Sequence, residues 1–267
     1  MTSEPSQRDE KASSERQPPA EVSIIMPCFN EAESIERVLR EWKELLDEEV
    51  IAHEIIVVND GSTDGTGRVL DRIRRDTKGI KVIHQLNAGS ESATRRGYEL
   101  CRGKFVLHAE ASGRYEPLDF LRLWEQRDSA PFVMAFRTHR LDSPLRRGLS
   151  RALRSLLRRS FNLQLTDPNI PFRLVRRDLA MVALKRIPTS ARALNLWMNI
   201  ILAQLVDGPI PEVAVPFRKR LSHRLRRNQE TLFRKSMNVF RDFMSMKYGN
   251  GTQPGLGKIP IFTPQNA

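Results

Sequence analysis

The chain has 267 residues, 40% of them hydrophobic, and a formal net charge of +12. These values exclude a chain that is disordered throughout and fit one domain of ordinary to large size, or one domain with an appendage. Only two cysteines are present, which excludes a disulfide framework and indicates a reducing compartment.

The first half alternates short apolar runs with helical patterns, after a leader (1–20) whose composition predicts disorder. We expect Asn30 to cap the first helix, with Glu33 completing a capping box. Strands are expected at 22–26, 55–58, 81–84, 105–107 and 132–135, and helices at 35–46, 69–73, 90–101 and 117–126. This alternation predicts an α/β fold with a mainly parallel sheet that helices cover on both faces. Ligands then bind beyond the carboxyl ends of the strands, at loops 27–31, 59–66 and 109–116.

The second half is strongly basic. Residues 1–136 carry 19 basic and 25 acidic side chains, whereas residues 137–241 carry 23 and 6. Residues 145–161 form a helical pattern of leucines and arginines, which suits a membrane surface or a helix that packs its leucines on the sheet. A second basic run (218–227) precedes an expected helix at 228–246, and 247–267 is expected to be a loose tail. The charge indicates an anionic partner, but no helix-turn-helix, aromatic RNA-binding or zinc-finger pattern accompanies it, so we expect no nucleic acid.

Several common site motifs are missing from the sequence. It contains no G-x-G-x-x-G after the first strand, no G-x-x-x-x-G-K-[ST], no zinc-ligand spacing and no G-x-S-x-G. Dinucleotide binding, P-loop hydrolysis and serine hydrolysis therefore lose their best sequence support.

Three blocks in the first half carry a family resemblance. They are V-S-I-I-M-P-C-F-N-E at 22–31, E-I-I-V-V-N-D-G-S-T-D-G-T at 54–66, and Asn87-x-Gly89 followed by Gly97 and Gly103. Their order and spacing resemble the family 2 glycosyltransferases, although Lys104 stands where that pattern usually has an acid. The resemblance implies a GT-A (Rossmann-like) fold with a nucleotide-sugar-binding half at 21–136 and an acceptor-side half at 137–246. The donor would be a GDP- or UDP-sugar.

The second half resembles one branch of that family. D-P-N-I-P-F-R-L-V-R-R at 167–177, Arg137, and E-V-A-V-P-F at 212–217 followed by Arg220 and Ser222 are similar to blocks of dolichol-phosphate mannose synthases and other polyprenyl-phosphate glycosyltransferases. The match is looser here, because Pro171 and Leu221 stand where the branch has glycine. The acceptor implied is a polyprenyl phosphate.

Candidate site residues follow from chemistry and resemblance together. A carboxylate at a strand end can accept a hydrogen bond from a base N–H, which suits Asp60, placed on an exposed loop, and Glu31 could take base or ribose hydroxyls. The other interpretation of Asp60 is a simple turn and helix cap. The set that we expect to bind the nucleotide sugar is Pro27, Phe29, Glu31, Asp60, Asn87 and Glu110.

The acceptor needs positive charge rather than a base. A lipid phosphate is ionised at neutral pH, so arginines can hold it beside the sugar without a general base. Arg137, Arg173 and Arg220 are the candidates. The processive signature Q-x-x-R-W is absent, which favours transfer of a single sugar.

One segment departs from the family pattern, which has Asp-x-Asp followed by Gln-[YH]-x-P. The aligned residues are E-A-S-G-R-Y-E-P at 110–117, so Ser112 replaces the second acid and Arg114 replaces Gln. The resemblance implies Mg²⁺ or Mn²⁺ with Glu110 as a ligand, whereas the lost acid and the added cation argue against a metal. Glu110, Arg114 and Arg137 are the candidate catalytic residues.

The resemblance implies an inverting glycosyltransferase that moves one sugar to a polyprenyl phosphate at the cytoplasmic membrane face. An anionic membrane surface or a membrane partner subunit would bring it to the lipid. Two alternatives stay open: transfer to another acceptor, and a non-catalytic relative that binds nucleotide sugars after losing its metal site.

Overall fold

A computed structural model describes residues 19–138 and 144–218. The predicted leader (apart from its last two residues), most of the basic run 218–227, the predicted helix at 228–246, the tail and Arg220 lie outside the described residues.

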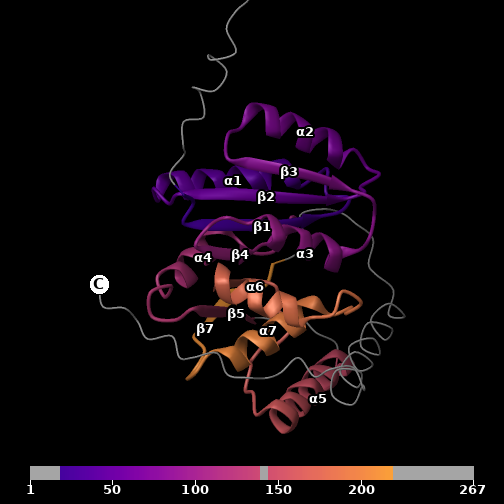
Figure 1. Ribbon diagram of the computed structural model, residues 1–267. Helices are drawn as coiled ribbons and strands as arrows, with labels where there is room; N and C mark the ends of the chain where they lie inside the picture. The colour runs from indigo at the N-terminus through magenta and orange to yellow at the C-terminus, as the bar shows by residue number, and fades with distance from the viewer. Residues whose placement is uncertain (1–18, 139–143, 219–267) are drawn as a thin grey trace, which may run out of the picture.

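Within the described residues, seven strands form one twisted sheet (Figure 1). They are β1 (Val22–Cys28), β2 (His53–Asp60), β3 (Ile80–Gln85), β4 (Phe105–His108), β5 (Phe132–Thr138), β6 (Arg173–Arg176) and β7 (Glu212–Pro216), in the order β3-β2-β1-β4-β6-β5-β7. Neighbouring strands are parallel except at β6, which runs antiparallel to both β4 and β5. The predicted α/β, mainly parallel sheet is confirmed, and strands from both predicted halves of the chain belong to it.

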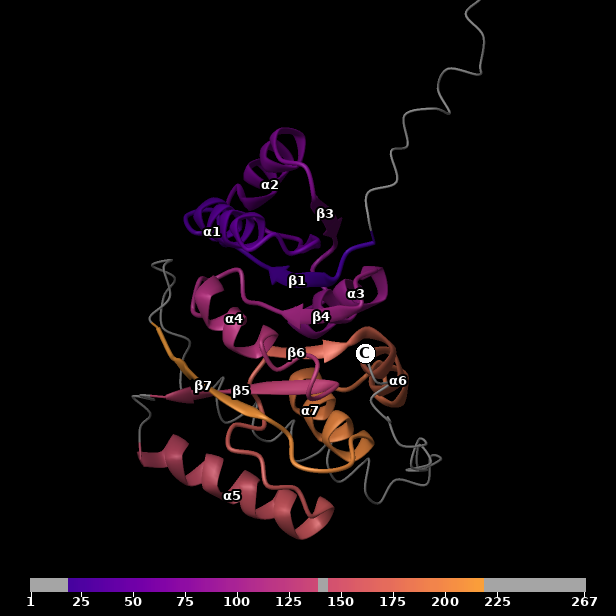
Figure 2. The same ribbon diagram turned by 90° about the vertical axis from the view of Figure 1, so that its left-hand side faces the viewer.

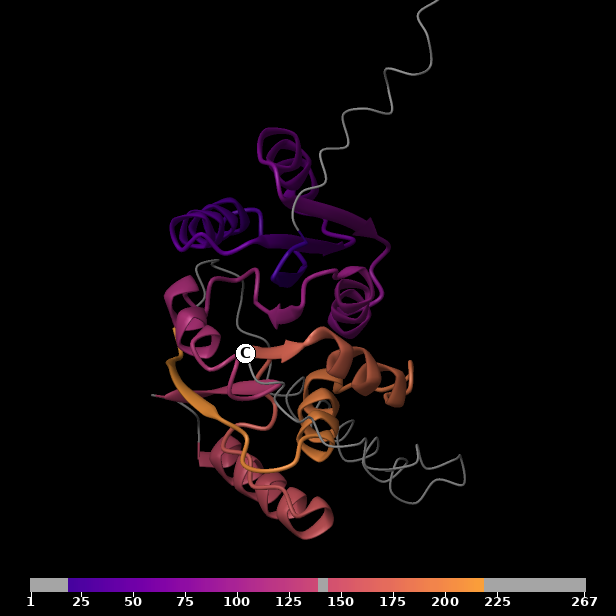
Figure 3. The same cartoon turned by 60° about the vertical axis from the view of Figure 1, so that its left-hand side comes forward.

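Helices cover both faces of the sheet (Figures 2 and 3). The helices are α1 (Ile35–Glu48), α2 (Thr66–Asp76), α3 (Ser90–Leu100), α4 (Pro117–Trp124), α5 (Pro144–Phe161), α6 (Arg177–Arg186) and α7 (Leu194–Leu205). In the turned views α1 and α4 lie on one face and α3, α6 and α7 on the other, while α5 lies beyond the β5–β7 end of the sheet, far from α2. No described helix combines the length and the apolar character needed to cross a bilayer.

The core explains why these residues form these elements. The central strands β1 and β2 are buried almost throughout, as their nearly continuous apolar runs require when helices cover both faces of a sheet. Helix α1 turns one apolar stripe inward, and Trp42 of that stripe contacts Phe120 and Phe172 across the layer.

The topology gathers loops at one edge. Strands β1 to β5 and β7 all end there, and because β6 is antiparallel, the turn that enters β6 at Arg173 reaches the same edge. Loops that follow β1, β2 and β4 are therefore joined by the end of β5, the entry to β6 and the end of β7.

Two sequence expectations need correction. Asn30 does not cap α1, which begins at Ile35 after Ser34; Asn30 instead has φ 53° and its side chain accepts a hydrogen bond from the Thr63 N–H at 2.7 Å. The elements β6, α6, α7 and β7 were not predicted. Strand β6 is only four residues long and has arginine at both ends, and α7 is buried on most of its sides, so neither shows a clear polar-apolar period.

Candidate functional site

The loops after β1 and β2 are bonded to each other. Asn30 N–H donates to Ser62 Oγ at 2.9 Å, Glu31 N–H to Thr66 Oγ1 at 2.9 Å, and Ala32 N–H to Asp64 Oδ2 at 3.3 Å. The loop that was expected to contact a nucleotide is thus held by backbone and side-chain hydrogen bonds before any ligand arrives.

The sequence predicts Asp60 on an exposed loop, and this prediction is wrong. Asp60 is the last residue of β2 and only 3% exposed. Its carboxylate accepts hydrogen bonds from Gln85 Nε2 at 2.8 Å and from the N–H groups of Ala88 and Gly89, each at 2.9 Å. Asp60 therefore shapes the loop after β3. Gly61 allows the close approach: it has φ +65°, and a Cβ there would lie 2.7 Å from the Asn87 nitrogen.

The remaining residues expected at the nucleotide sugar lie along the same edge. Pro27 and Phe29 are partly exposed at the end of β1, and the Asn87 side chain is exposed on the loop that Asp60 shapes. Glu31 is buried and accepts a hydrogen bond from Ser34 Oγ at 3.1 Å, while the same hydroxyl lies 3.4 Å from the Ala111 carbonyl oxygen. Ser34 thus connects the β1 loop to the β4 loop.

The end of β4 carries Glu110, Ser112 and Arg114. Ser112 Oγ donates to Glu110 Oε2 at 3.0 Å, and Arg114 Nη1 lies 3.6 Å from the same oxygen. Hard divalent cations require several oxygen ligands. Here the one carboxylate of the motif is already paired with a guanidinium, and nowhere in residues 19–138 and 144–218 do three acidic, His or Cys side chains group around a point. The residues present do not fit a Mg²⁺ or Mn²⁺ site.

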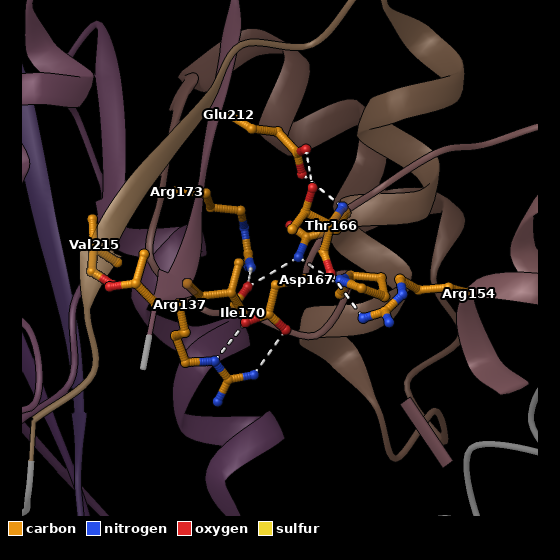
Figure 4. Close-up of polar contacts among 11 residues, drawn as sticks. Arg137, Arg154, Thr166, Asp167, Ile170, Arg173, Glu212 and Val215 are labelled. Carbon is orange, nitrogen blue, oxygen red and sulfur yellow. Dashed lines mark hydrogen bonds and ion pairs between the residues drawn. The ribbon is translucent and has the colours of Figure 1, made fainter. Parts of the chain in front are cut away.

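Arg137, at the end of β5, lies at the same edge and is firmly held (Figure 4). Its Nε donates to Asp167 Oδ2 at 2.5 Å and its Nη2 to Asp167 Oδ1 at 2.8 Å, a bidentate pair in which both side chains are largely buried. Burial alone would lower the pKa of Arg137, but the hydrogen bonds and charge of Asp167 raise it. The ring of Phe217, just after β7, lies 5.2 Å from the Arg137 guanidinium carbon and 5.5 Å from that of Arg114.

The turn that carries Asp167 is anchored from several sides. Asn199 Nδ2 of α7 donates to the carbonyl oxygens of Pro168 and Ile170, at 3.0 and 2.9 Å. On the outer side, Thr166 donates through its N–H and hydroxyl to Glu212 at the start of β7 (Figure 4). The Asp167 carboxylate, and with it the Arg137 guanidinium, is therefore placed by two separate elements, α7 and β7.

Arg173 is not placed to meet an acceptor phosphate, contrary to expectation. Its side chain is fully buried, and it donates to Tyr98 Oη at 3.1 Å, to the Ile170 carbonyl at 3.3 Å and to Asn195 Oδ1 at 3.2 Å. The arginine instead supports the Asp167 turn from beneath.

Three residues at this edge were given no role from the sequence: Tyr115, Asp167 and Phe217. The ring of Tyr115 stacks on Phe172 with centroids 4.8 Å apart, and its side chain is 3% exposed. Asp167 opens the second-half block and Phe217 closes the last one, so their places in those blocks were the available signal. The missing information was the fold that brings the two block ends together.

Comparisons with known proteins agree with this architecture. The family described as Glycosyl transferase family 2 matches residues 23–182. An undecaprenyl-phosphate 4-deoxy-4-formamido-L-arabinose transferase of Pseudomonas fluorescens is 33% identical over 173 residues, 63% of this chain and 51% of that protein. A dolichyl-phosphate beta-glucosyltransferase of Dictyostelium discoideum is 27% identical over 215 residues, 73% of this chain and 65% of that protein.

The chain spans about half the length of the first of these relatives, 51% of it. Among solved structures, glucosyl-3-phosphoglycerate synthase from Mycobacterium tuberculosis, in complex with Mn²⁺, UDP and glucosyl-3-phosphoglycerate, superposes with a TM-score of 0.61 at 20% identity, covering 85% of this chain and 79% of that one. This likeness confirms the GT-A fold. Because the family match covers well over half of the chain, the protein belongs to glycosyl transferase family 2.

Proposed function

We propose that the protein transfers one sugar from a nucleotide diphosphate sugar, with UDP or GDP as the leaving group, to a polyprenyl phosphate. The family assignment and the relatives named for undecaprenyl and dolichyl phosphates support this reaction class. The observation that carries the proposal is the meeting of the predicted donor loops with Arg114, Arg137 and Phe217 at one sheet edge.

The chemistry at that edge suits an in-line displacement with inversion. The acceptor phosphate oxygen is already charged, so its attack on the anomeric carbon needs no proton transfer, and the bond to the leaving diphosphate breaks as the new one forms. In this mechanism the arginines orient two anionic groups that would otherwise repel each other. Arg137 faces the acceptor phosphate and Arg114 the leaving diphosphate, with Arg220 as a further acceptor ligand.

The nucleotide end of the donor is proposed to lie over the β1 and β2 loops. Asp60 and Glu31 keep the roles proposed for them at the base and ribose, and Asp60 acts also through the loop that it shapes. Pro27, Phe29 and Asn87 remain proposed nucleotide-sugar-binding residues. Since Glu110 pairs with Arg114, we propose that bound Mg²⁺ or Mn²⁺ contributes less here than in relatives with two acids.

The place of action is proposed to be the cytoplasmic membrane face. Helix α5 exposes Arg147, Arg151, Arg158 and Arg159, and such a face attracts anionic lipid headgroups. A membrane partner subunit is the other way to bring the protein to its acceptor.

A direct assay tests the proposal. Purified protein is incubated with UDP- and GDP-sugars and a short-chain polyprenyl phosphate, and both nucleoside diphosphate release and lipid-linked sugar are measured. We expect product with the lipid phosphate and inverted anomeric configuration by NMR. If glycosylated product formed only with an acceptor other than the lipid phosphate, the proposed acceptor would be wrong.

A second candidate is a non-catalytic protein that binds nucleotide sugars. The observation in its favour is the Glu110–Ser112–Arg114 arrangement, which lacks the second acid. Tight binding of a nucleotide sugar in calorimetry, without turnover under any metal or acceptor, would establish this candidate in place of the first.

A further inference from the structure

The hydroxyl of Tyr115 is a buried polar group with no hydrogen-bond partner in the described part of the chain. Its ring stacks on Phe172 at an interplanar angle of 11°, so the hydroxyl oxygen cannot easily move to another partner. Leaving a buried donor unsatisfied destabilises a fold, and native proteins rarely keep such a group without a reason. A ligand that accepts a hydrogen bond would supply that reason.

The charges around this hydroxyl point to the kind of ligand. Burial first, and then the charges of Glu110 and Asp167, raise the pKa of Tyr115, while the charges of Arg137 and Arg114 act to lower it. The phenol therefore stays protonated at neutral pH and can donate. The guanidiniums of Arg137 and Arg114 lie within electrostatic reach of it, beside the carboxylates with which they pair, and their remaining N–H groups can bind the same anionic group.

The two guanidiniums keep donors for such a ligand. Asp167 accepts from Nε and Nη2 of Arg137, and a guanidinium has five N–H groups, so Nη1 retains its donors with respect to Asp167. Arg114 is partly exposed and held against the Phe217 ring. Both arginines are thus placed by neighbours while keeping N–H groups to offer.

We propose that Tyr115 is a ligand-binding residue whose hydroxyl donates a hydrogen bond to an oxygen of one of the two substrate phosphate groups that Arg114 and Arg137 orient. The inference rests on the proposed function and deepens it. It names a hydrogen-bond donor, Tyr115, to which the family resemblance gave no role. The phosphate belongs either to the donor's diphosphate or to the lipid acceptor. Its binding requires no divalent cation.

The test compares Tyr115→Phe with a matched control, Tyr98→Phe. Tyr115→Phe removes one unpartnered hydroxyl and keeps the stacked ring, whereas Tyr98→Phe removes a hydroxyl that Arg173 already uses. For each protein, the melting temperature is measured, and calorimetry in EDTA gives affinities for UDP, GDP, inorganic pyrophosphate and a short-chain polyprenyl phosphate.

We expect Tyr115→Phe to keep or raise the melting temperature and to weaken phosphate binding by about tenfold, the factor that corresponds to ~1.4 kcal/mol. Tyr98→Phe should instead lower the melting temperature, because Arg173 loses a hydrogen-bond partner. Weaker binding of pyrophosphate and the nucleotides would place the hydroxyl at the donor, and weaker binding of the lipid phosphate alone would place it at the acceptor.

The inference is overturned if Tyr115→Phe binds every probe as the wild type does, or if the wild type binds them only with added Mn²⁺. These results are distinct from failure of the proposed function. That failure would be phosphate binding with the Tyr115 dependence intact but no sugar transfer to lipid phosphate.

Discussion

Arg114 brings a fixed positive charge to the end of β4, where the family pattern instead places acids that hold a dication. Glu110 and Asp167 face Arg114 and Arg137 at this edge, so two carboxylates are balanced by two guanidiniums. Two carboxylates with one divalent cation have the same formal balance. The site can therefore present a comparable field to a leaving diphosphate with charges that belong to the chain itself.

This balance predicts a weak metal dependence. We expect transfer by the wild type to survive EDTA, and Arg114→Gln to lower kcat/KM by about 10²-fold, the effect typical of losing one electrostatic contact to developing charge. The double variant Ser112→Asp with Arg114→Gln should restore an acid pair and become stimulated by Mn²⁺. The measurement is the rate of lipid-linked sugar formation with and without EDTA. A wild type that EDTA inactivates, together with an indifferent Arg114→Gln, would contradict this prediction.

Asp60 predicts a coupled loss of structure and binding. Because its carboxylate accepts three hydrogen bonds from the loop after β3, Asp60→Ala should destabilise the fold by about 1–3 kcal/mol and release that loop. Nucleotide affinity should fall as well. Hydrogen exchange at Ala88 and Gly89 measures the first effect and calorimetry with UDP and GDP the second, with Asp71→Asn on α2 as a control. Unchanged nucleotide affinity would remove Asp60 from the site.

At the scale of elements, the sequence predicts best where the pattern is local. Strands β1 and β2 and helix α1 have continuous apolar runs or a clear helical period, and they lie where these patterns indicate. Strand β6 has neither, because its four residues derive their stability from the two strands that enclose it. Tertiary context also explains why Arg173 was misjudged: the sequence predicts a phosphate ligand, whereas the side chain is buried and bonded to other parts of the fold.

The candidate site divides in the same way. The position of Asp60 at a strand end could be predicted, since strand ends are visible in the sequence. The partners of Asp60 could not be predicted, because Ala88 and Gly89 donate through backbone N–H groups that any residue except proline would offer. The Arg137–Asp167 pair joins residues 30 positions apart in the chain, and no local pattern encodes such a contact.

Glu54, near the start of β2, gives a pH prediction. Burial acts to raise the pKa of Glu54, but hydrogen bonds from Lys81, Ser23 and the Arg102 N–H outweigh it and lower the pKa. A carboxyl whose folded pKa is lowered stabilises the fold above its unfolded pKa, and this contribution disappears as the pH falls through the folded value. The difference in melting temperature between wild type and Glu54→Gln should therefore be largest near pH 7 and shrink below about pH 4.

The matched control for this measurement is Glu41→Gln, which removes an exposed ion pair with Arg37. Such pairs contribute about 0–1 kcal/mol, so this variant should melt close to the wild type at every pH. If the difference in melting temperature between wild type and Glu54→Gln stayed constant from pH 7 to pH 3, the charge of Glu54 would not stabilise the fold.

At the scale of the whole molecule, the arginine-rich helix α5 stands at one end of the sheet. Helix α5 lies beyond β5 and β7, far from α2 at the β3 end (Figure 1). Leu157 of α5 is buried and Leu153, Leu156 and Phe161 are partly buried, so its apolar stripe packs on the fold in part, while several arginines face outward. Arg154 of the same helix donates to the Thr166 carbonyl, beside Asp167. The basic face is thus attached close to the proposed acceptor arginine.

This arrangement predicts a directional attachment to anionic membranes. Each exposed arginine near such a surface contributes about 1 kcal/mol, and the attraction is screened within about 10 Å at 0.1 M salt. Replacing Arg147, Arg151, Arg158 and Arg159 by Gln should abolish co-sedimentation with phosphatidylglycerol vesicles at low salt.

The matched control replaces Arg37, Arg40, Arg74 and Arg75, which are exposed on α1 and α2, and removes the same charge from the other end of the molecule. We expect the control to bind vesicles nearly as the wild type does, because its arginines would face away from the membrane when α5 is docked. Equal loss in the two variants would mean that net charge alone drives binding, and then a partner subunit, rather than α5, would have to bring the site to a lipid phosphate.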